Sequence, residues 1–442
     1  MNTPTQFGSA VGPRLDALSV GPFHRRMLAL IGEGLFLDGF ELYLTAGVLG
    51  ALTKSGWSTM SMNAGFVMAT FIGMMIGAWT AGIIGDRFGR RFAYQFNLML
   101  FGLASLAAAL APNMETLIGL RFIMGLGLGA EVVVGYSMLT EFMPARSRGR
   151  MIGWLAVITN SSLFVATFLG IWIIPNFGWR YMFAIVGVGA IIIWALRRSM
   201  PDSPRWLESQ GRTGEAEAIL DSIGAPKASG PSSLPAAVQK VSIAVLFRPP
   251  VLGRTLMGIL VNIVIGFCLY GFINWLPTFF VKQGETIVAS LVWTTVMALG
   301  APTGAVIGLL LVDKIGRKPI IVGASLWAAA FGSLFPFVGG GVPLMITGFF
   351  LFIGIYALLA VAFALHVPEL FATEYRLRGV GVCSTVGRLS TALVQYVVIA
   401  LFAWGGVMGV VGLLVSLLLV QALVFLLFGI ETKQRSLEEI AA

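Results

Sequence analysis

Two carboxylates lie close together inside an apolar stretch of the chain. Asp38 and Glu41 are three residues apart in the sequence LFLDGFELYL. On an α-helix this spacing places both side chains on one face, about 60° apart. Burial raises the pKa of a carboxylate and a nearby arginine lowers it, so acids in this setting can bind and release a proton. Two carboxylates this close are expected to titrate as a coupled pair.

A lone arginine, Arg388, lies in another apolar stretch that holds no acid. Its planar guanidinium can pair with one of the carboxylates above or hold an anionic substrate by two hydrogen bonds. Aromatic rings beside an arginine would suit a flat carboxylate, although each ring could equally pack against lipid or core. Candidate wall residues for such a site are Asn160, Tyr270, Asn274, Trp275 and Tyr356.

The composition places these residues in a membrane protein. Of the 442 residues, 57% are hydrophobic and 11% are charged, whereas a soluble domain carries roughly 25% charged residues. A membrane-spanning helix needs about 20 apolar residues, and the chain holds twelve such runs. They cover residues 27–50, 62–84, 92–111, 115–138, 149–174, 179–198, 254–280, 288–312, 319–338, 343–365, 377–403 and 405–428. We therefore predict an all-α membrane protein with twelve transmembrane helices.

The basic residues predict the orientation of the chain. With twelve spans, all but five of the 29 lysines and arginines lie on the side of the two termini, Arg197 at the end of the sixth run among them. Lys54, Arg180 and Lys282 lie on the other side, and Arg121 and Arg388 lie within the membrane. Cytoplasmic loops carry such an excess of Lys and Arg. Both termini are thus expected in the cytoplasm, and the net charge of +9 needs no nucleic-acid partner.

Depth in the membrane brings an arginine near the two carboxylates. At a rise of about 1.5 Å per residue, Glu41 lies at about 21 Å and Arg121 at about 22 Å from the cytoplasmic side of a core about 30 Å thick. Asp38 lies lower, at about 16 Å. We expect Arg121 to pair with these acids and the pair to open and close during proton transfer. A permanent ion pair that only joins two helices is the alternative.

The two halves of the chain repeat one plan. GDRFGRR at residues 85–91 returns as VDKIGRK at 312–318, and EFMPARSR at 141–148 returns as ELFATEYR at 369–376. PDSPR after the sixth run is echoed by IETKQ after the twelfth. Parallel six-helix repeats are a transporter design. The expected parts are a cytoplasmic segment 1–26, a six-helix bundle 27–198, a cytoplasmic loop 199–253, a second six-helix bundle 254–428 and a cytoplasmic tail 429–442.

These motifs resemble those of the major facilitator superfamily, whose most specific signature is the loop Gly-Asp-Arg-x-Gly-Arg-Arg. The acid-x6-Arg pairs and the PDSPRWL and ETK segments are similar to those of its sugar-porter and organic-ion branch. Asp38-x-x-Glu41 and GLGLGAEVVVGYSMLTEFMPARSRGR resemble the bacterial nicotinate-type and synaptic-vesicle-2-like carriers. They also resemble the aromatic-acid:proton symporters, whose first span carries Asp-Gly-x-Asp.

The resemblance implies two pseudo-symmetric six-helix bundles around a cavity lined by the first, fourth, seventh and tenth spans. RFIMG, which begins at Arg121, is similar to an Arg-x-x-x-Gly element implicated in proton coupling. An arginine in the eleventh span, here Arg388, resembles the anion carriers of the organic-ion group. The loop motifs predict a cytoplasmic gate in which acids and arginines of neighbouring loops pair. Its residues are Asp86, Arg90, Glu141, Arg148, Asp313, Arg317, Glu369 and Arg376.

The expected function is secondary active transport by alternating access, with uptake of a small organic anion coupled to protons. An aromatic or heteroaromatic carboxylate such as nicotinate or a benzoate relative is the leading substrate; a sugar or polyol porter and an organic-cation carrier are the alternatives. No nucleotide loop, metal-spaced cluster or nucleophile motif predicts an enzyme. We expect no cofactor besides the proton, a monomer in lipid, and a place in the bacterial inner membrane.

Overall fold

The computed structural model describes residues 11–226, 243–249, 251–371 and 375–431 of the chain. All regular elements within these residues are helical, and ten helical segments there are long and apolar enough to cross a membrane. The all-α membrane fold predicted from the sequence is confirmed.

The first half of the chain forms six long helices, α2 to α7. Asn113 and Thr59 cap two of them through side-chain oxygens that accept a backbone N–H, which satisfies a donor that the helix leaves free. The helices are α2 (Pro22–Lys54), α3 (Met60–Phe88), α4 (Arg90–Ala109), α5 (Met114–Phe142), α6 (Ala145–Phe177) and α7 (Arg180–Leu196), followed by a short 3-10 turn, Arg197–Ser199.

Small residues let α3 and α5 pack closely. A Cβ on Gly77 would lie 2.0 Å from the carbonyl oxygen of Leu126, and one on Gly129 would lie 2.1 Å from that of Met74. Any larger side chain would push the two backbones apart. Interfaces of this kind are typical of helix pairs in membranes, where close van der Waals packing replaces the hydrophobic drive.

The second half repeats this arrangement with more irregular helices. Its elements are α10 (Val251–Gly266), α11 (Leu276–Lys282), α12 (Ile287–Ala298), α13 (Gly300–Ile315), α14 (Arg317–Leu334), α15 (Val342–Leu358), α16 (Val367–Glu369) and α17 (Arg376–Phe428). The predicted eighth span corresponds to α12 and α13 together. The predicted eleventh and twelfth spans are both contained in α17, which breaks at Gly405 and Gly406.

Two predicted spans of the second half are interrupted by other helix types. After α10 the chain passes through a π-helix, Phe267–Phe272, and a 3-10 turn, Ile273–Trp275, before α11 begins. A second π-helix, Leu359–His366, follows α15. Such segments change the phase of the helix, and they often occur at functional sites. The regular spacing that the sequence predicts for residues 254–280 therefore does not hold along the whole run.

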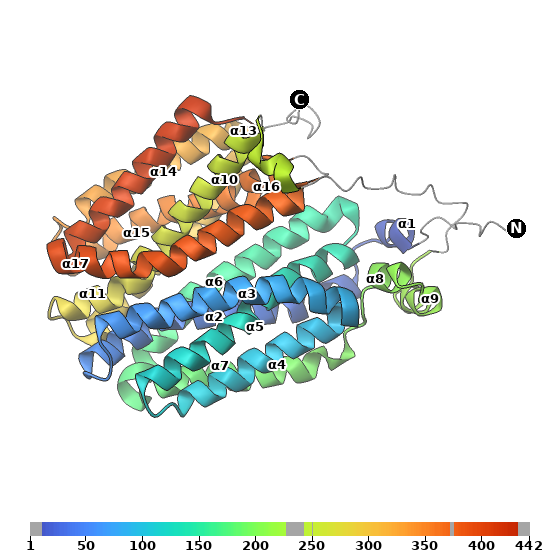
Figure 1. Cartoon of the computed structure of the whole chain (residues 1–442), viewed down its shortest axis with the longest axis horizontal. Helices are drawn as coiled ribbons and strands as arrows, with labels where there is room; N and C mark the ends of the chain where they lie inside the picture. The colour runs from blue at the N-terminus through green and yellow to red at the C-terminus, as the bar shows by residue number, and fades with distance from the viewer. Residues whose placement is uncertain (1–10, 227–242, 250, 372–374, 432–442) are drawn as a thin grey trace, which may run out of the picture.

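Three short helices lie beside the membrane helices at one end of the molecule, which we call the α8–α9 end (Figure 1). They are α1 (Val11–Asp16), α8 (Pro204–Ser209) and α9 (Thr213–Ser222). Leu15 of α1 packs with Trp206 of α8 and Leu220 of α9 in a small apolar cluster. The segment between the halves is thus partly folded and covers the first half.

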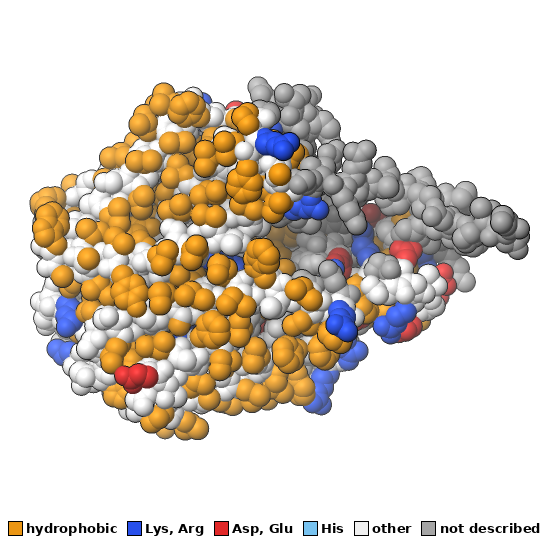
Figure 2. Space-filling view, viewed as in Figure 1, with side chains coloured by type: hydrophobic (Ala, Val, Ile, Leu, Met, Phe, Trp, Pro, Cys, Tyr) orange, Lys and Arg blue, Asp and Glu red, His pale blue; other side chains and the backbone are white. Residues whose placement is uncertain are grey.

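The two halves lean together at the opposite end, where α11 lies beside α2 (Figure 1). A Cβ on Gly50 of α2 would lie 3.5 Å from Pro277 of α11, and one on Gly47 would lie 3.0 Å from Leu291 of α12. Figure 2 shows hydrophobic side chains spread over the sides of the long helices, with most of the visible charged side chains near the α8–α9 end. This distribution fits a bundle whose sides face lipid.

Candidate functional site

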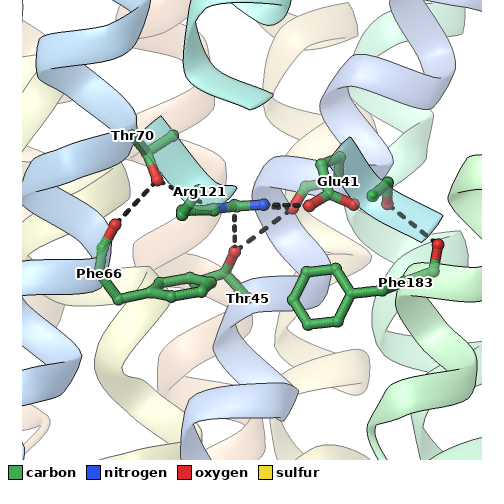
Figure 3. A network of polar contacts seen from close by, with 7 residues as sticks. Glu41, Thr45, Phe66, Thr70, Arg121 and Phe183 are labelled. Atoms are coloured by element: carbon green, nitrogen blue, oxygen red, sulfur yellow. Dashed lines mark hydrogen bonds and ion pairs between the residues drawn. The ribbon is translucent and has the colours of Figure 1, made fainter. Parts of the chain in front are cut away.

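Glu41 and Arg121 form a buried ion pair between α2 and α5 (Figure 3). Nη1 of Arg121 donates to the Glu41 carboxylate. Nε donates to the Thr70 hydroxyl at 2.9 Å, and Nη2 donates to the Thr45 hydroxyl at 2.6 Å. The guanidinium also lies over the ring of Phe66, 4.7 Å from its centroid. Every part of the arginine head group therefore has a partner, as a buried charge requires.

A second buried ion pair lies between α5 and the end of α7. Arg197 donates from Nη1 to Glu131 at 2.8 Å and from Nε to the carbonyl of Leu30 at 2.8 Å. Its guanidinium stacks on the ring of Tyr94, 4.0 Å from the centroid. Arg197 is only 1% exposed. The sequence analysis counted Arg197 among the basic residues on the side of the two termini and did not predict that its side chain extends back into the bundle to meet an acid.

Asp38 and Glu41 have different neighbours. Glu41 contacts Arg121, whereas Asp38 interacts electrostatically mainly with Glu131 and Arg197. Asp38 is 2% exposed, and its two carboxylate oxygens have no hydrogen-bond partner among the described residues. The two acids that the sequence places on one face of a helix therefore lie in two different environments.

Tyrosines from the two halves contact each other. The hydroxyl of Tyr356 on α15 donates to that of Tyr43 on α2 at 3.2 Å. Tyr270, in the π-helix, packs edge-on against Phe71 of α3 at 4.6 Å between centroids. Tyr270 also interacts electrostatically with Tyr43 and Arg388. We did not predict Tyr43, although it stands two residues after Glu41 on the same helix.

Arg388 joins the two halves through a backbone contact. Its Nη1 donates to the carbonyl oxygen of Met74 on α3 at 3.1 Å. The side chain is half-buried, and it forms no ion pair with a described acid. Arg388 was expected to pair either with a carboxylate of the first span or with an anionic substrate. The described part of the structure does not show the pair with the carboxylate.

The other predicted wall residues differ in their surroundings. Trp275 is fully buried, and its Nε1 donates to Gln395 within the second half at 2.8 Å. Asn274 is buried with its Oδ1 lacking a partner among the described residues. Asn160 is half-buried on α6. Trp275 thus has its hydrogen bond inside one half, whereas Asn274 retains an unused acceptor.

The repeated loop motifs form two similar networks at the α8–α9 end. In the first half, Arg90 lies 3.5 Å from Glu141. In the second half, Arg317 lies 3.0 Å from Glu369. Arg376 donates to the carbonyl of Phe371. The side chains of Asp86, Arg148 and Asp313 lie outside the described part of the structure.

Each network also contains a carboxylate that the sequence analysis did not assign. Asp202 accepts the backbone N–H groups of Arg90 and Arg91 at 3.0 and 3.2 Å. Glu431 accepts those of Arg317 and Lys318 at 3.0 and 3.1 Å. Both acids cap the N-terminus of a helix, where negative charge is favourable. The echo of PDSPR by IETKQ was the signal for this pair.

Glycine makes room for both caps. Gly89 and Gly316 precede the capped helices with φ of 98° and 106°, values that only glycine adopts readily. A Cβ on Gly89 would lie 2.4 Å from the carboxylate of Asp202, and one on Gly316 would lie 2.6 Å from that of Glu431. The glycine of the repeated loop motif is therefore required for both its backbone conformation and its lack of a side chain.

The chain is similar to known membrane transport proteins. Residues 31–442 match the family described as sugar (and other) transporter. The inner membrane metabolite transport protein YdjE of Escherichia coli is 37% identical over 98% of each chain. The niacin transporter NiaP of Acinetobacter baylyi is 32% identical over 97% of this chain and 98% of the relative.

The fold is that of a solved transporter. A partially occluded inward open conformation of the xylose transporter XylE from Escherichia coli superposes with a TM-score of 0.75 at 20% identity, covering 94% of this chain and 100% of that one. The protein belongs to the sugar (and other) transporter family of the major facilitator superfamily, and it is an integral membrane transporter and not an enzyme.

Proposed function

We propose that this transporter takes up a small organic anion together with protons, and that an aromatic or heteroaromatic carboxylate such as nicotinate is its substrate. The observation that carries the proposal is Arg388, a half-buried guanidinium between the halves that forms no ion pair with a described acid. It interacts with Tyr270, which lies against Phe71. An arginine beside aromatic rings suits a flat carboxylate. The niacin transporter among the relatives supports the same class.

The balance of buried charge supports proton coupling. Among the described side chains of α2 to α7 and the turn after α7, three acids, Asp38, Glu41 and Glu131, and two arginines, Arg121 and Arg197, are buried. One bound proton makes this set neutral. Burying an unpaired charge is costly, and Asp38 is the acid whose oxygens lack partners. Asp38 therefore carries the proton in this proposal, while Glu41 and Arg121 form the ion pair next to the substrate path.

The orientation follows from the charges at the α8–α9 end, which we propose to be cytoplasmic, with both termini on that side of a bacterial inner membrane. The relative from Escherichia coli is named as an inner membrane protein. Because the halves touch at the opposite end, the structure then represents an inward-facing state. The networks of Arg90 with Glu141 and of Arg317 with Glu369 would belong to the cytoplasmic gate.

Uptake into proteoliposomes tests this proposal. We expect radiolabelled nicotinate to accumulate when the lumen is alkaline, and Arg388→Gln to weaken its binding about 10- to 100-fold, since a charge-assisted hydrogen bond is worth about 1.5–3 kcal/mol. Arg254→Gln is the matched control, because Arg254 is a half-buried arginine of the same half. Binding of carboxylates that is unchanged in Arg388→Gln would contradict the anion site.

Coupling is tested in the same vesicles. Asp38→Asn is expected to lose accumulation against a gradient but to keep exchange of nicotinate across the membrane, since the carboxamide cannot take up a proton. Glu41→Gln should also uncouple transport by freeing Arg121. Proton-driven accumulation by both variants would show that neither acid carries the proton.

Sugar transport is the second candidate, because the matching family is described as sugar (and other) transporter. A thermal-shift series with nicotinate, benzoate, xylose and tetraethylammonium separates the candidates. Stabilisation by xylose alone would favour a sugar as the substrate, and stabilisation by tetraethylammonium alone would favour an organic cation.

A further inference from the structure

Asp38, Glu131 and Arg197 form a cluster of ionisable groups apart from the Glu41–Arg121 pair. The three side chains come from α2, α5 and the 3-10 turn after α7. They are 2%, 0% and 1% exposed. Three buried ionisable groups in one place need a function or a strong structural reason, because desolvation of charges is costly even in pairs.

One nitrogen and three carboxylate oxygens of this cluster have no hydrogen-bond partner among the described residues: Nη2 of Arg197, both oxygens of Asp38 and Oε2 of Glu131. Nε and Nη1 of Arg197 have partners, but Nη2 is buried and has none among the described residues. A Cβ on Gly34 would lie 1.7 Å from Nη2, so this nitrogen lies directly against α2. Asp38 is four residues further along α2 and therefore on the same helix face. Its two unpartnered oxygens thus lie one turn from an unpartnered guanidinium nitrogen.

The surroundings of Asp38 contain few other charges. Its electrostatic neighbours are Glu131 and Arg197, and Glu41 on its own helix. From α4, Tyr94 lies under the Arg197 guanidinium. From α6, the described neighbour of this part of α2 is a hydroxyl, Ser162, which a Cβ on Gly39 would meet. Among these neighbours, Arg197 is the positively charged group, and it is therefore the one with which an ionised Asp38 could pair.

We propose that Arg197 is the partner that Asp38 acquires when it releases its proton. In the state described here, Asp38 holds a proton and is neutral, and Arg197 is paired with Glu131. When the Asp38 O–H transfers its proton to water on the α8–α9 side, the carboxylate accepts a hydrogen bond from Nη2. Arg197 then bridges two carboxylates and keeps its own charge. It acts as a positioning residue that sets the pH at which Asp38 lets the proton go.

Hydrogen bonds and a ring contact hold the backbone near Arg197 and its guanidinium in place. The carbonyl of Arg198 accepts from Arg91, and Asp202 caps α4. The guanidinium is held by Leu30 and by the Tyr94 ring. The partner that we propose for Asp38 is thus held in place by Leu30, Glu131 and Tyr94 before the proton leaves.

This inference rests on the proposed role of Asp38 as proton carrier, and a titration separates the two. The infrared absorption of protonated carboxyl groups is followed against pH on the purified full-length protein in detergent, with no substrate present. Asp38→Asn identifies the Asp38 band by its loss. If the band is unchanged in Asp38→Asn, the proton carrier itself is wrongly assigned.

Two variants then test the role of Arg197, and they are expected to shift the midpoint of the Asp38 band in opposite directions. Glu131→Gln frees Arg197 for Asp38, so the midpoint of the Asp38 band should fall by about one pH unit, a tenfold change in proton affinity. The double variant Glu131→Gln with Arg197→Gln removes the pair without changing net charge, and its midpoint should rise by about one unit. Loss of the Glu131 charge alone also lowers the midpoint in Glu131→Gln, so the double variant decides: a midpoint there at or below the wild-type value would overturn the inference.

Arg197→Lys provides a second measurement that does not depend on how the double variant folds. Lysine keeps the charge, but its single ammonium cannot hold two carboxylates in the fork geometry of arginine. We expect a smaller rise of the Asp38 midpoint than in the double variant. A wild-type midpoint in Arg197→Lys would show that charge alone suffices and would contradict the bridging role.

Discussion

The two halves of the transporter share one plan at the α8–α9 end and differ in the membrane. Arg90 and Arg317 each pair with an acid, and each follows a glycine with positive φ. Inside the membrane, the first half buries two ion pairs. At the spacing of 227 residues that relates Arg90 to Arg317, the positions of Glu41, Arg121, Glu131 and Arg197 are occupied by Cys268, Gly348, Leu358 and Val424.

This difference separates what the fold needs from what transport needs. A buried ion pair is often no more stabilising than well-packed apolar residues in its place. The second half folds with apolar residues at the corresponding positions, so the helix packing itself does not require the charges. We therefore propose that the first half carries its ion pairs for transport, to which the second half contributes aromatic rings and Arg388.

The largest effect is expected from breaking one ion pair. Arg121→Met leaves Glu41 buried without its partner, which should lower the free energy of unfolding by about 3–5 kcal/mol. Chemical unfolding of the purified protein in detergent measures this loss. The double variant Glu41→Gln with Arg121→Met should regain most of it. A double variant as unstable as the single one would show that the first half needs the pair for folding.

The two helix caps are expected to contribute equally. Asp202→Ala and Glu431→Ala each remove a carboxylate that accepts two backbone N–H groups. Each variant should lose about 0.5–2 kcal/mol of unfolding free energy. The same unfolding experiment compares them directly. Losses that differ by more than this range would mean that the halves are not equivalent at the α8–α9 end.

The hydrogen bond between the halves should have a modest effect on conformation. Tyr356→Phe removes the donor to Tyr43, worth about 0.5–1.5 kcal/mol. Spin labels at Phe88→Cys and Ile315→Cys, which are exposed and related by the repeat, report the separation of the halves. The population of the described state should fall a few-fold. Tyr396→Phe, at an exposed tyrosine, is the control and should leave the distances unchanged.

The smallest effect is expected outside the membrane. Arg212, just before α9, and Glu215 of α9 form an exposed pair at 2.7 Å, and this hydrogen bond lowers the pKa of Glu215. Its contribution is present at neutral pH and lost as the pH falls through that lowered value. Because solvent screens such pairs, Glu215→Gln should leave the unfolding midpoint unchanged at neutral and acidic pH. A measurable loss would mean that the α8–α9 segment supports the membrane helices.

Much of this structure could be predicted from the sequence. Apolar runs predicted the long membrane helices, and the depths of Glu41 and Arg121 predicted that they meet, because a straight helix has a fixed rise per residue. Arg197 could not be placed in this way. It lies at the end of a helix, and only the turn that follows directs its side chain back toward Glu131.

Helix irregularity set a second limit. The sequence predicts one regular helix over residues 254–280, but a π-helix and a 3-10 turn contain Tyr270 and Asn274. Apolar composition does not distinguish helix types, because all of them bury the same side chains. The hydrogen bond between Tyr43 and Tyr356 joins residues 313 positions apart, and it depends on how the two halves meet.

In each half, an acidic residue that follows the last membrane helix caps an earlier helix. Asp202 returns to α4, and Glu431 returns to α14. A protein shortened before Glu431 would keep all its membrane helices and still lose the cap of α14. Purification tags and fluorescent fusions should therefore be joined beyond this residue, and proteolysis near it is expected to loosen the second half without cutting any helix.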